Sequence, residues 1–582
     1  MGYKILRWWL TSLLAVVAFV CAGCGSDEEF PPPPLFRQVT IGDLPVLGES
    51  HSGTFLDLDN DGFLDLLAPD PVGRIDLFRN GGRLDFFKTD RRQYAGLARS
   101  AAHGMAACDF DNDGDWDVFV TADTDRGRAF GRNHLWRREK AGNFVDVGED
   151  DPVLSDPIGR GQGGLWADFD ADARPELLIF NYQSQVRMAA ATSAGWRDVT
   201  TRLPWPPAVK MNLDGPPPEA RLRARSGWIH TAIAADLDGD HRQDLLAIGR
   251  PGWSGVLMNQ GAGVLAESTA VSGLKHALWP KTPSHVAMGD LNEDGRPDLV
   301  FCYLTSDEFT RNYAPLEIWR NDSQPGQLAF ERKRFVERGE QENTLLTEVG
   351  RPESAILADL DNDGHLDLYV VQPAEVKATS PNLLYQGHGD ESFTDVSTIW
   401  GGGGPPDSAP ESAWAVDLDN DGDLDLVTFN GGEPFLPTSL HRGVTVYENL
   451  GTGGVLPPDS DDGPRDEKAL AAAAAAGGNR GLTIQLVSQI GPPHGLGAVA
   501  TLVAGESRQV RWSQSLVGGM GTAVLPLHFG VGRTEGPYQL QIRWAGGTEQ
   551  VFDIPAAGRA YAVREGDKMV VELPRKSTGG GS

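Results

Sequence analysis

The sequence contains little cysteine and little positive charge, and both shortages limit what the protein can be. Only four of the 582 residues are cysteine, and two of these fall within the first 24 residues. A disulfide framework is therefore excluded, and we expect Cys108 and Cys302 to be buried free thiols within strands. With 51 Lys and Arg against 81 Asp and Glu, the formal net charge is −30. An acidic chain without a basic stripe repels phosphate, which disfavours nucleic-acid binding.

The chain also lacks the short motifs of the common enzyme classes. It has no H-E-x-x-H zinc motif, no G-x-S-x-G turn, no phosphate-binding loop and no dinucleotide-binding fingerprint. The missing motifs favour a binding protein over an enzyme, and they leave open catalysis through an unfamiliar site.

The N-terminus has an apolar stretch that is too short to favour a membrane-spanning helix. This stretch runs from Trp8 to Val20 and follows Lys4 and Arg7, whereas a spanning helix needs roughly 20 apolar residues. Basic residues, a short apolar stretch and then small residues indicate an export signal.

The sequence CAGCGS follows this stretch. The letters AGC, which end at Cys24, match a lipobox, in which the cysteine is lipidated and becomes the first residue of the mature chain; Cys21 stands where leucine is usual. We therefore expect residues 1–24 to be a lipoprotein-type signal peptide that anchors the protein in a bacterial cell envelope, at the outer membrane or surface. Ordinary cleavage and secretion are the alternative. The proline-rich residues 25–35 would form a stiff, polar tether.

Aspartate, in contrast, is plentiful and follows a fixed pattern. In DLDNDGFLD, which begins at Asp57, aspartate stands at positions 1, 3, 5 and 9, and glycine stands at position 6. Carboxylates this close repel one another unless a cation lies between them. Together with the backbone carbonyl of Phe63 at position 7, they would supply the oxygen ligands that calcium binds. The first half resembles an EF-hand loop, but an apolar run follows, so we predict strands on both sides.

This nine-residue loop occurs seven times, with starts separated by 52 to 69 residues. Local turn preferences of Asp, Asn and Gly would explain one copy, but not seven copies in the same phase. Loops 1 to 7 are residues 57–65, 109–117, 168–176, 236–244, 290–298, 359–367 and 417–425. The candidate calcium ligands are Asp57, Asp59, Asp61, Phe63, Asp65, Asp109, Asp111, Asp113, Asp115, Asp117, Asp168, Asp170, Asp172, Glu176, Asp236, Asp238, Asp240, Asp244, Asp290, Asn292, Asp294, Asp298, Asp359, Asp361, Asp363, His365, Asp367, Asp417, Asp419, Asp421, Asp423 and Asp425.

Loops 3, 4 and 5 depart from the full pattern. Loop 3 has Ala173 in place of glycine and ends in Glu176, loop 4 has His241 in place of glycine, and loop 5 has Asn292. Acidic residues still fill 27 of the 28 positions, so seven divalent ions would reduce the net charge from −30 to −16. We expect about four to seven calcium ions, with loop 3 the weakest site. Calcium would then stabilise a chain that has no disulfides.

The spacing of the loops predicts an all-β fold. A period of roughly 50 to 70 residues with several short strands is typical of propeller blades. The last unit lacks the aromatic outer strand found in other units, and FRQVT at residues 36–40 has that pattern with no unit before it. We therefore predict a seven-bladed β-propeller over residues 36–452, in which the N-terminal strand completes the last blade and closes the ring.

A second domain follows the propeller. Residues 453–480 contain paired prolines, an acidic cluster and an alanine run, which are typical of a linker. Residues 481–573 contain alternating strands such as YQLQIRW between glycine-rich turns, and they predict a small antiparallel β-sandwich. Residues 574–582 are predicted to be a flexible tail.

Both parts of the chain resemble known families. The seven acidic units are similar to the FG-GAP or VCBS repeats of integrin-α-like propellers over about residues 36–452. The segment that begins GLTIQLV and continues through LPLHFGVG to YQLQIRWAGG resembles the ASPIC/UnbV domain. Together they resemble the cartilage acidic protein family, which has many secreted bacterial members. The resemblance makes His528 and Arg543 candidates for a binding face, with buried structural roles as the alternative.

A second alignment concerns the residue six positions before each loop. The innermost strand of a blade leads to the loop, so these residues would form a polar ring at the opposite mouth of the central channel. They could face solvent as strand starts, bind a polar or anionic ligand, or coordinate a transition metal such as zinc, copper, iron or nickel. The ring residues are His51, His103, Gln162, His230, Ser284, Glu353 and Glu411.

These observations predict an exported, calcium-binding, surface-anchored propeller that binds a protein or glycan partner. We expect contact with a membrane only through the lipid anchor. The alternative is an enzyme, or an assembly and maturation factor of an exported pathway, that uses the ring. A ring that converges on a metal other than calcium would favour this alternative, whereas a dispersed and solvated ring would favour the binding protein.

Overall fold

The structure is a computed structural model, and it describes most of the two predicted domains. The signal peptide, Cys24, the tether up to residue 34, His51 and most of the linker and tail lie outside the described residues. Within the described part, no helix has the length and apolar character needed to cross a membrane. The described residues are 35–39, 53–69, 74–82, 84–97, 102–122, 132–140, 142–155, 160–182, 186–193, 195–204, 229–249, 254–278, 283–303, 316–333, 336–337, 352–372, 382–404, 410–430, 443–451, 478–518 and 521–575.

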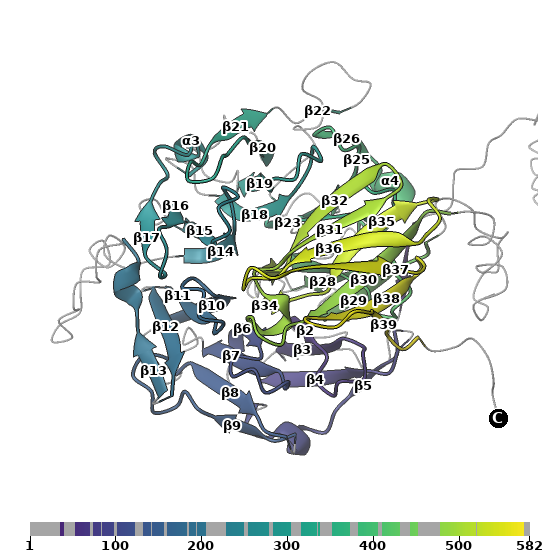
Figure 1. Ribbon diagram of the computed structural model, residues 1–582. Helices are drawn as coiled ribbons and strands as arrows, with labels where there is room; N and C mark the ends of the chain where they lie inside the picture. The colour runs from purple at the N-terminus through teal and green to yellow at the C-terminus, as the bar shows by residue number, and fades with distance from the viewer. Residues whose placement is uncertain are drawn as a thin grey trace, which may run out of the picture.

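The described residues up to 451 form seven sheets whose four main strands pair in the same antiparallel way (Figure 1). Helices there are short, namely α3 (Lys275–Leu278), α4 (Ser397–Trp400) and 3-10 turns at Arg91–Tyr94 and Thr200–Arg202. Sheets 1 to 7 consist of β2–β5 (Thr54–Leu56, Asp65–Pro69, Ile75–Asn80, Phe86–Lys88); β6–β9 (Ala102–Cys108, Asp117–Ala122, His134–Arg138, Phe144–Asp146); β10–β13 (Arg160–Ala167, Glu176–Tyr182, Arg187–Thr192, Gly195–Asp198); β14–β17 (Ile229–Ala235, Asp244–Gly249, Gly255–Asn259, Leu265–Glu267); β18–β21 (Pro283–Gly289, Asp298–Tyr303, Leu316–Asn321, Phe330–Lys333); β23–β26 (Ser354–Ala358, Asp367–Val371, Leu383–Gly387, Ser392–Asp395) with β22 (Val336–Glu337) at its edge; and β27–β29 (Pro410–Val416, Asp425–Asn430, Gly443–Asn449) with β1 (Phe36–Val39).

The sheets pack face to face around a ring, which explains the apolar run after each acidic loop. Successive side chains of a strand point to opposite faces, so Leu66 of β3 packs against sheet 7 and Leu67 packs against sheet 2. Each pair of neighbouring sheets encloses a hydrophobic cluster of this kind. The predicted all-β propeller fold is confirmed.

The ends of the propeller meet in sheet 7. Strand β1 pairs with β29, with Phe36 opposite Asn449, as the sequence predicted. The outer strand of the last sheet thus comes from the start of the domain. The pairing removes an open edge that would otherwise invite aggregation.

An asparagine at the end of the third strand links several sheets to their neighbours. In sheet 1 the side-chain amide of Asn80 donates to the Leu418 carbonyl of loop 7 at 2.8 Å. Asn321 of sheet 5 donates in the same way to Leu237 of loop 4 at 2.8 Å, and Asn449 of sheet 7 donates to Leu360 of loop 6 at 2.7 Å. These buried bonds fix the acidic loops of adjacent sheets relative to one another.

The C-terminal domain is a β-sandwich of two sheets over one core. Its sheets have the strand orders β35-β30-β38-β39 and β32-β31-β36-β37. One pair departs from the predicted antiparallel arrangement, because β30 and β38 run parallel. The chain returns to β30 only after building the other sheet, and such a crossover permits parallel pairing. The strands are β30 (Arg480–Val487), β31 (Val499–Ala504), β32 (Ser507–Trp512), β35 (Leu527–Gly532), β36 (Tyr538–Arg543), β37 (Glu549–Ile554), β38 (Arg559–Arg564) and β39 (Val571–Glu572), with a 3-10 turn at Pro493–Gly495.

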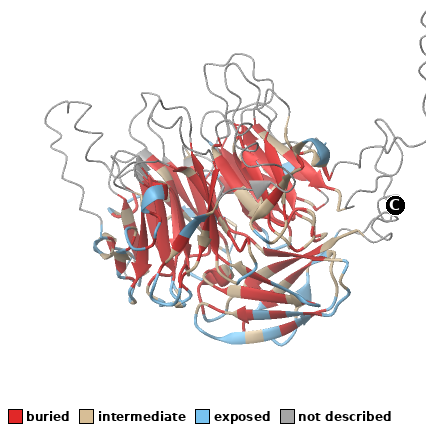
Figure 2. Ribbon diagram, turned by 90° about the horizontal axis from the view of Figure 1, so that it is seen from above, coloured by how far each residue is buried: buried red, intermediate tan, exposed pale blue. Residues whose placement is uncertain are grey.

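A hairpin of the sandwich domain enters the propeller ring. Strands β33 (Ser515–Gly518) and β34 (Gly521–Val524) form this hairpin, and β34 pairs in parallel with the inner strand β6. The Thr522 hydroxyl donates to the Gly164 carbonyl of sheet 3 at 2.8 Å, and the Thr54 hydroxyl of sheet 1 donates to the Thr522 carbonyl at 2.9 Å. The hairpin therefore lies among inner strands of several sheets, and the sandwich lies against one face of the ring (Figure 2).

Candidate metal centres

The seven acidic loops share one backbone conformation. Position 4 has φ between +58° and +77°, and position 6 has φ between +69° and +103°, in every loop. Both values belong to the left-handed region that favours glycine and asparagine. Loops 3 and 4 adopt this conformation without glycine at position 6, since Ala173 has φ of +69° and His241 has φ of +72°.

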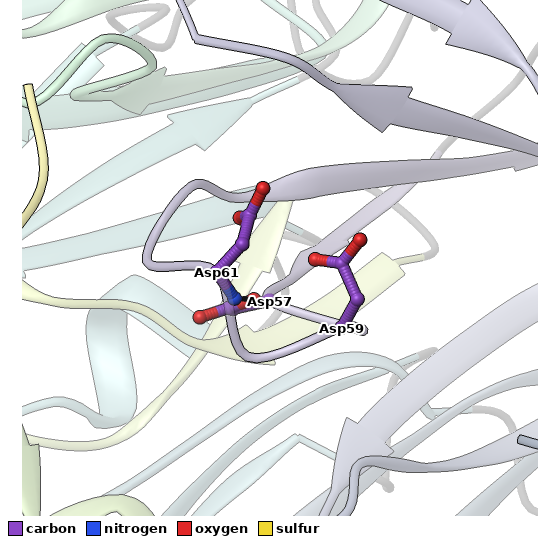
Figure 3. A group of neighbouring side chains, drawn as sticks. All are labelled: Asp57, Asp59 and Asp61. Atoms are coloured by element: carbon purple, nitrogen blue, oxygen red, sulfur yellow. Dashed lines mark hydrogen bonds between the residues drawn. The ribbon is translucent and has the colours of Figure 1, made fainter. Parts of the chain in front are cut away.

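Each loop folds around its first and last carboxylates. In loop 1, Asp57 accepts hydrogen bonds from the backbone N–H groups of Asp61 at 3.1 Å and Gly62 at 2.9 Å. Asp65 accepts from the Leu58 N–H at 3.1 Å and from the Asn80 N–H of the third strand at 2.8 Å. Figure 3 shows Asp57, Asp59 and Asp61 on this single turn. The backbone thereby holds the carboxylates side by side.

Several loops bring three carboxylates close enough to hold a metal ion. Their oxygen atoms lie within 4.8 Å of one another. Some of these buried oxygens have no hydrogen-bond partner among the described residues, namely Asp170 Oδ1, Asp236 Oδ1 and Asp359 Oδ1. Buried carboxylate oxygens normally have a partner, so the loops fit a bound cation. The groups include Asp57, Asp59 and Asp61; Asp109, Asp111 and Asp117; Asp168, Asp170 and Glu176; Asp236, Asp238 and Asp244; and Asp359, Asp361 and Asp367.

The side chains at position 7 of loops 2, 6 and 7 belong to residues that were predicted as candidate ligands, but they bind other groups. Asp115 Oδ1 accepts from Arg138 at 2.6 Å, His365 pairs with Glu293, and Asp423 accepts from the Asn362 amide at 2.6 Å. Position 7 therefore keeps its backbone carbonyl as the candidate ligand, as proposed for Phe63.

Loops 1 and 3 each also contact an arginine from outside the nine-residue pattern. Arg79 lies 2.8 Å from Asp59 and 3.0 Å from Asp65. Arg202 lies 2.7 Å from Asp170 and 2.8 Å from Glu176. A guanidinium between two carboxylates supplies the charge that a cation would supply, so it competes with a metal at these loops. The arrangement is the same in both loops, so the expectation that loop 3 is the weakest site stays a prediction.

Burial makes the loop carboxylates hard to ionise without a cation. It raises the pKa of Asp57 to about 6, that of Asp244 to about 8 and that of Asp117 to about 9. The pKa of Asp359 is raised well above its ordinary value for the same reason. A bound cation would reverse this cost, because it stabilises the charged form.

These pKa values predict a pH dependence that calcium reverses. The folded carboxylates have raised pKa values, so their contribution to stability is complete below about pH 4 and is lost as the pH rises through about 6 to 9. The metal-free protein should therefore be less stable towards urea at pH 8 than at pH 6. Calcium binds the ionised form, so its affinity should fall about tenfold from pH 8 to pH 6 in a loop with a ligand pKa near 7. Urea titrations at pH 6 and pH 8, with EDTA or with calcium, test both expectations. If the protein in calcium is also less stable at pH 8 than at pH 6, the account is contradicted.

The left-handed positions of loops 3 and 4 predict stabilising substitutions. Ala173→Gly and His241→Gly should each stabilise the protein by about 1 kcal/mol, because glycine adopts positive φ without steric cost. The matched control is Gly114→Ala in loop 2, where φ is +91° and a Cβ would meet no atom within 4 Å. Gly114→Ala should lower the free energy of unfolding by a similar amount, as measured by urea unfolding at saturating calcium. Stabilisation by G114A, or destabilisation by both glycine variants, would contradict the shared conformation.

The sandwich domain binds directly to the acidic loops of sheets 4, 6 and 7. The Gly530 N–H donates to Asp359 at 3.0 Å, and the Thr483 hydroxyl donates to Asp417 at 2.7 Å. His528 Nε2 lies 2.9 Å from the Gly422 carbonyl, and Arg543 lies 3.5 Å from Asp236. The two residues proposed for a binding face therefore contact the propeller of the same chain.

The tips of loops 2 and 3 remain exposed. Asp111, Asp113 and Asp172 are exposed, whereas Asp361 of loop 6 and Asp421 of loop 7 are half-buried. The loop face of sheets 2 and 3 is thus part of the accessible acidic surface, together with Asp59 and Asp61 of loop 1 and Asp294 of loop 5.

Four of the described residues of the predicted polar ring lie at irregular points of the inner strands, whereas Glu353 directly precedes β23. The register shifts at or around Gln162, His230, Ser284 and Glu411, and also around His103, whose side chain lies outside the described residues. His230 Nε2 lies 3.0 Å from the Pro283 carbonyl, and the Ser284 hydroxyl donates to the Pro352 carbonyl at 2.8 Å. These side chains link neighbouring sheets, and the role of the ring in ligand binding stays a prediction.

The two described cysteines agree with the prediction of free thiols. Cys108 and Cys302 are both buried and form no disulfide. Burial raises the pKa of the Cys108 thiol well above its ordinary value, so this cysteine is a poor nucleophile. Neither residue is a candidate catalytic group.

Comparison with known proteins agrees with both domains. An FG-GAP-like repeat family model matches residues 57–120, 109–179, 236–301 and 359–428, and an ASPIC and UnbV model matches residues 490–570. Human cartilage acidic protein 1 is 23% identical over 461 residues, which cover 72% of this chain and 62% of the human protein. The mouse protein is also 23% identical, with 72% and 64% covered. The chain thus spans less than two thirds of these curated relatives.

Solved structures with a similar trace include BBS1N in complex with ARL6DN, soaked with lead, which is 8% identical with a TM-score of 0.39 and covers 74% of this chain and 99% of that one. YCF48 from Cyanidioschyzon merolae is 10% identical with a TM-score of 0.40 and covers 71% and 98%. On the family models, this chain is an FG-GAP-repeat β-propeller with a C-terminal ASPIC and UnbV domain.

Proposed function

We propose that the protein is a calcium-stabilised interaction scaffold of the adhesion type, which presents its uncovered loop face to a protein or glycan. The observation that carries this proposal is that several loops each hold three carboxylates whose oxygens lie within 4.8 Å of one another, while loops 3, 4 and 6 each contain a buried oxygen without a hydrogen-bond partner among the described residues. Hard carboxylate and carbonyl oxygens suit calcium, and no sulfur or imidazole takes part in the carboxylate groups named above. Calcium would therefore fix the shape of the loops rather than perform chemistry.

The proposed partner site lies between loops 2 and 3. A hollow of about 680 Å³ opens there, lined by Phe110, Asp111, Arg137, Arg174 and Trp196 among others. Aromatic and arginine side chains in a concave surface are typical of residues that dominate binding energy. The sandwich domain covers other loops, which leaves this surface for a partner.

Binding of the full chain to immobilised glycans and matrix proteins tests the proposal. Affinity should depend on calcium and should fall at least about tenfold in Arg174→Glu and Trp196→Ala, as for central contact residues. Arg564→Glu on the sandwich is the matched control, because Arg564 is also exposed. A partner that binds equally well to R174E, or equally well in EDTA, would contradict the proposed surface.

We also propose that the chain reaches the cell envelope through lipidation of Cys24. The support is the order of basic, apolar and small residues at the N-terminus. Incorporation of labelled palmitate by the wild type but not by Cys24→Ala is the expected result. Equal labelling of both would contradict it.

A further inference from the structure

The hollow between loops 2 and 3 is formed by two neighbouring sheets. Loop 2, β8 and the segment after β9 contribute lining residues from sheet 2, and loop 3, β12 and β13 contribute them from sheet 3. None of the described lining residues belongs to the sandwich domain. The volume of about 680 Å³ lies within the roughly 300–1,000 Å³ of small-molecule sites. The space is therefore large enough for a ligand with more than one ring.

Trp196 contributes an aromatic ring that other aromatic rings hold in place. Its ring centroid lies 5.4 Å from that of Phe110 and 6.1 Å from that of Trp166, and the rings of Phe110 and Trp166 are stacked at an interplanar angle of 6°. Phe110 and Trp166 are buried, whereas Trp196 is half-buried and lines the hollow. Packing thus fixes the Trp196 ring before a ligand arrives, which lowers the entropy cost of binding.

The same hollow is lined by charged groups of both signs. Three carboxylates, which accept hydrogen bonds, stand against two guanidinium groups, which donate them. Two of the carboxylates are also candidate calcium ligands, so a bound ion would offset part of their charge. Neither sign dominates strongly, which favours a neutral ligand over a highly charged one. The charged lining residues are Asp111, Asp151, Asp172, Arg137 and Arg174.

Several of these groups keep hydrogen-bonding capacity for a ligand. Arg174 is exposed, and its guanidinium has no hydrogen-bond or ion-pair partner within the described part of the chain. Asp172 Oδ1 accepts from the Arg174 backbone N–H at 2.9 Å, which leaves further lone pairs on the carboxylate. Arg137 is already paired with Glu139 at 2.6 Å. Arg174 is therefore the cation of the hollow that is most available to a ligand.

We propose that this hollow binds a neutral oligosaccharide with one of its sugar rings packed on Trp196. A sugar ring has apolar C–H faces that suit an aromatic ring, and its hydroxyl groups both donate and accept. Each hydroxyl can thus pair with either a carboxylate or a guanidinium of the lining. The turn beside Trp196 leaves room, because a Cβ at Gly195 would meet no atom within 4 Å. The inference rests on the proposed function, since it assigns a ligand class to the same site.

Saturation-transfer NMR on the full chain in calcium tests the inference, with cellotriose, maltotriose, mannotriose and xylotriose as neutral probes. At least one of these sugars should bind. Trp196→Ala and Arg174→Ala should each weaken that binding about tenfold, as expected for a central aromatic contact and for one hydrogen bond to a charged group. Arg197→Ala is the matched control for Arg174→Ala, because Arg197 is exposed on β13 but does not line the hollow. It should leave the affinity unchanged.

Two further variants keep the test independent of folding. Trp196→Phe retains an aromatic ring and should bind more tightly than Trp196→Ala, whereas Ser193→Trp places a bulky side chain on the exposed lining and should prevent binding. Thermal melting checks that each variant folds.

No binding of any neutral probe at about 5 mM would overturn the inference. Equal affinity in R174A, W196A and the wild type would overturn it as well, and so would binding of trigalacturonate, an acidic trisaccharide, where no neutral sugar binds. If a protein partner binds the wild type but not R174E while no sugar binds, the ligand class is wrong and the proposed function stands. If neither a protein nor a sugar binds at this surface, both fail.

Discussion

Removal of calcium should lower the melting temperature of the protein by on the order of 10 °C. An ion that binds only the folded state stabilises it by about 2.7 kcal/mol at a hundredfold excess over its dissociation constant. Four occupied loops would then contribute about 10 kcal/mol, and a chain of this size melts about 1 °C lower for each kcal/mol lost. The effect is large because the loops bury carboxylates such as Asp117, whose pKa is raised to about 9.

The measurement is differential scanning calorimetry with EDTA, and then with excess calcium added back. Asp359→Asn and Asp417→Asn should each remove part of the calcium effect, since both carboxylates belong to intact loops and bind the sandwich. Magnesium, which keeps more of its water and demands octahedral geometry, should restore less stability than calcium. A melting temperature that does not respond to EDTA would contradict a stabilising role for calcium.

Gly481→Ala should detach the sandwich domain from loops 6 and 7. A Cβ at Gly481 would lie 2.2 Å from Asn362 Oδ1, 2.2 Å from the Gly422 carbonyl and 2.5 Å from His528 Nε2. Two of these atoms are rigidly held, so the domain must shift away, at a cost of about 1 to 3 kcal/mol. The expected result is faster amide exchange in loops 6 and 7 and faster proteolysis between the domains.

Gly546→Ala is the matched control, because a Cβ there would meet no atom within 4 Å. The sandwich itself should remain folded in both variants, since its core residues are not altered. If G481A and G546A show the same exchange and proteolysis, the interface does not hold the domains together as described.

The regular features of the fold could be predicted from the sequence because they repeat. Each acidic loop is followed by a buried strand, and the orphan strand at Phe36 fills the last sheet. Local sequence patterns were enough to predict these features, because the pattern of each loop or strand spans fewer than about ten residues. Asn80 and Asn321 could also have been found, because each is followed by a short turn at the same place in its unit.

The contact between the domains could not be predicted in this way. Gly530 contacts loop 6 through its backbone N–H, and Gly481 fits against the loops because it has no side chain. Neither kind of contact leaves a pattern in the sequence. The hairpin β33–β34 pairs with β6, about 400 residues earlier in the chain, and such long-range pairing depends on shape. Arg202 likewise contacts loop 3 because the fold brings the two together, and its position in the sequence does not indicate this contact.

Elemental analysis of the purified protein by inductively coupled plasma mass spectrometry tests the central claim most directly. The account predicts at least four calcium ions per chain and no stoichiometric transition metal. Fewer ions in Asp109→Asn than in the wild type would tie the count to loop 2. A protein purified in calcium that contains none, or that contains one zinc, copper or iron ion instead, would contradict the claim that the acidic loops are calcium sites.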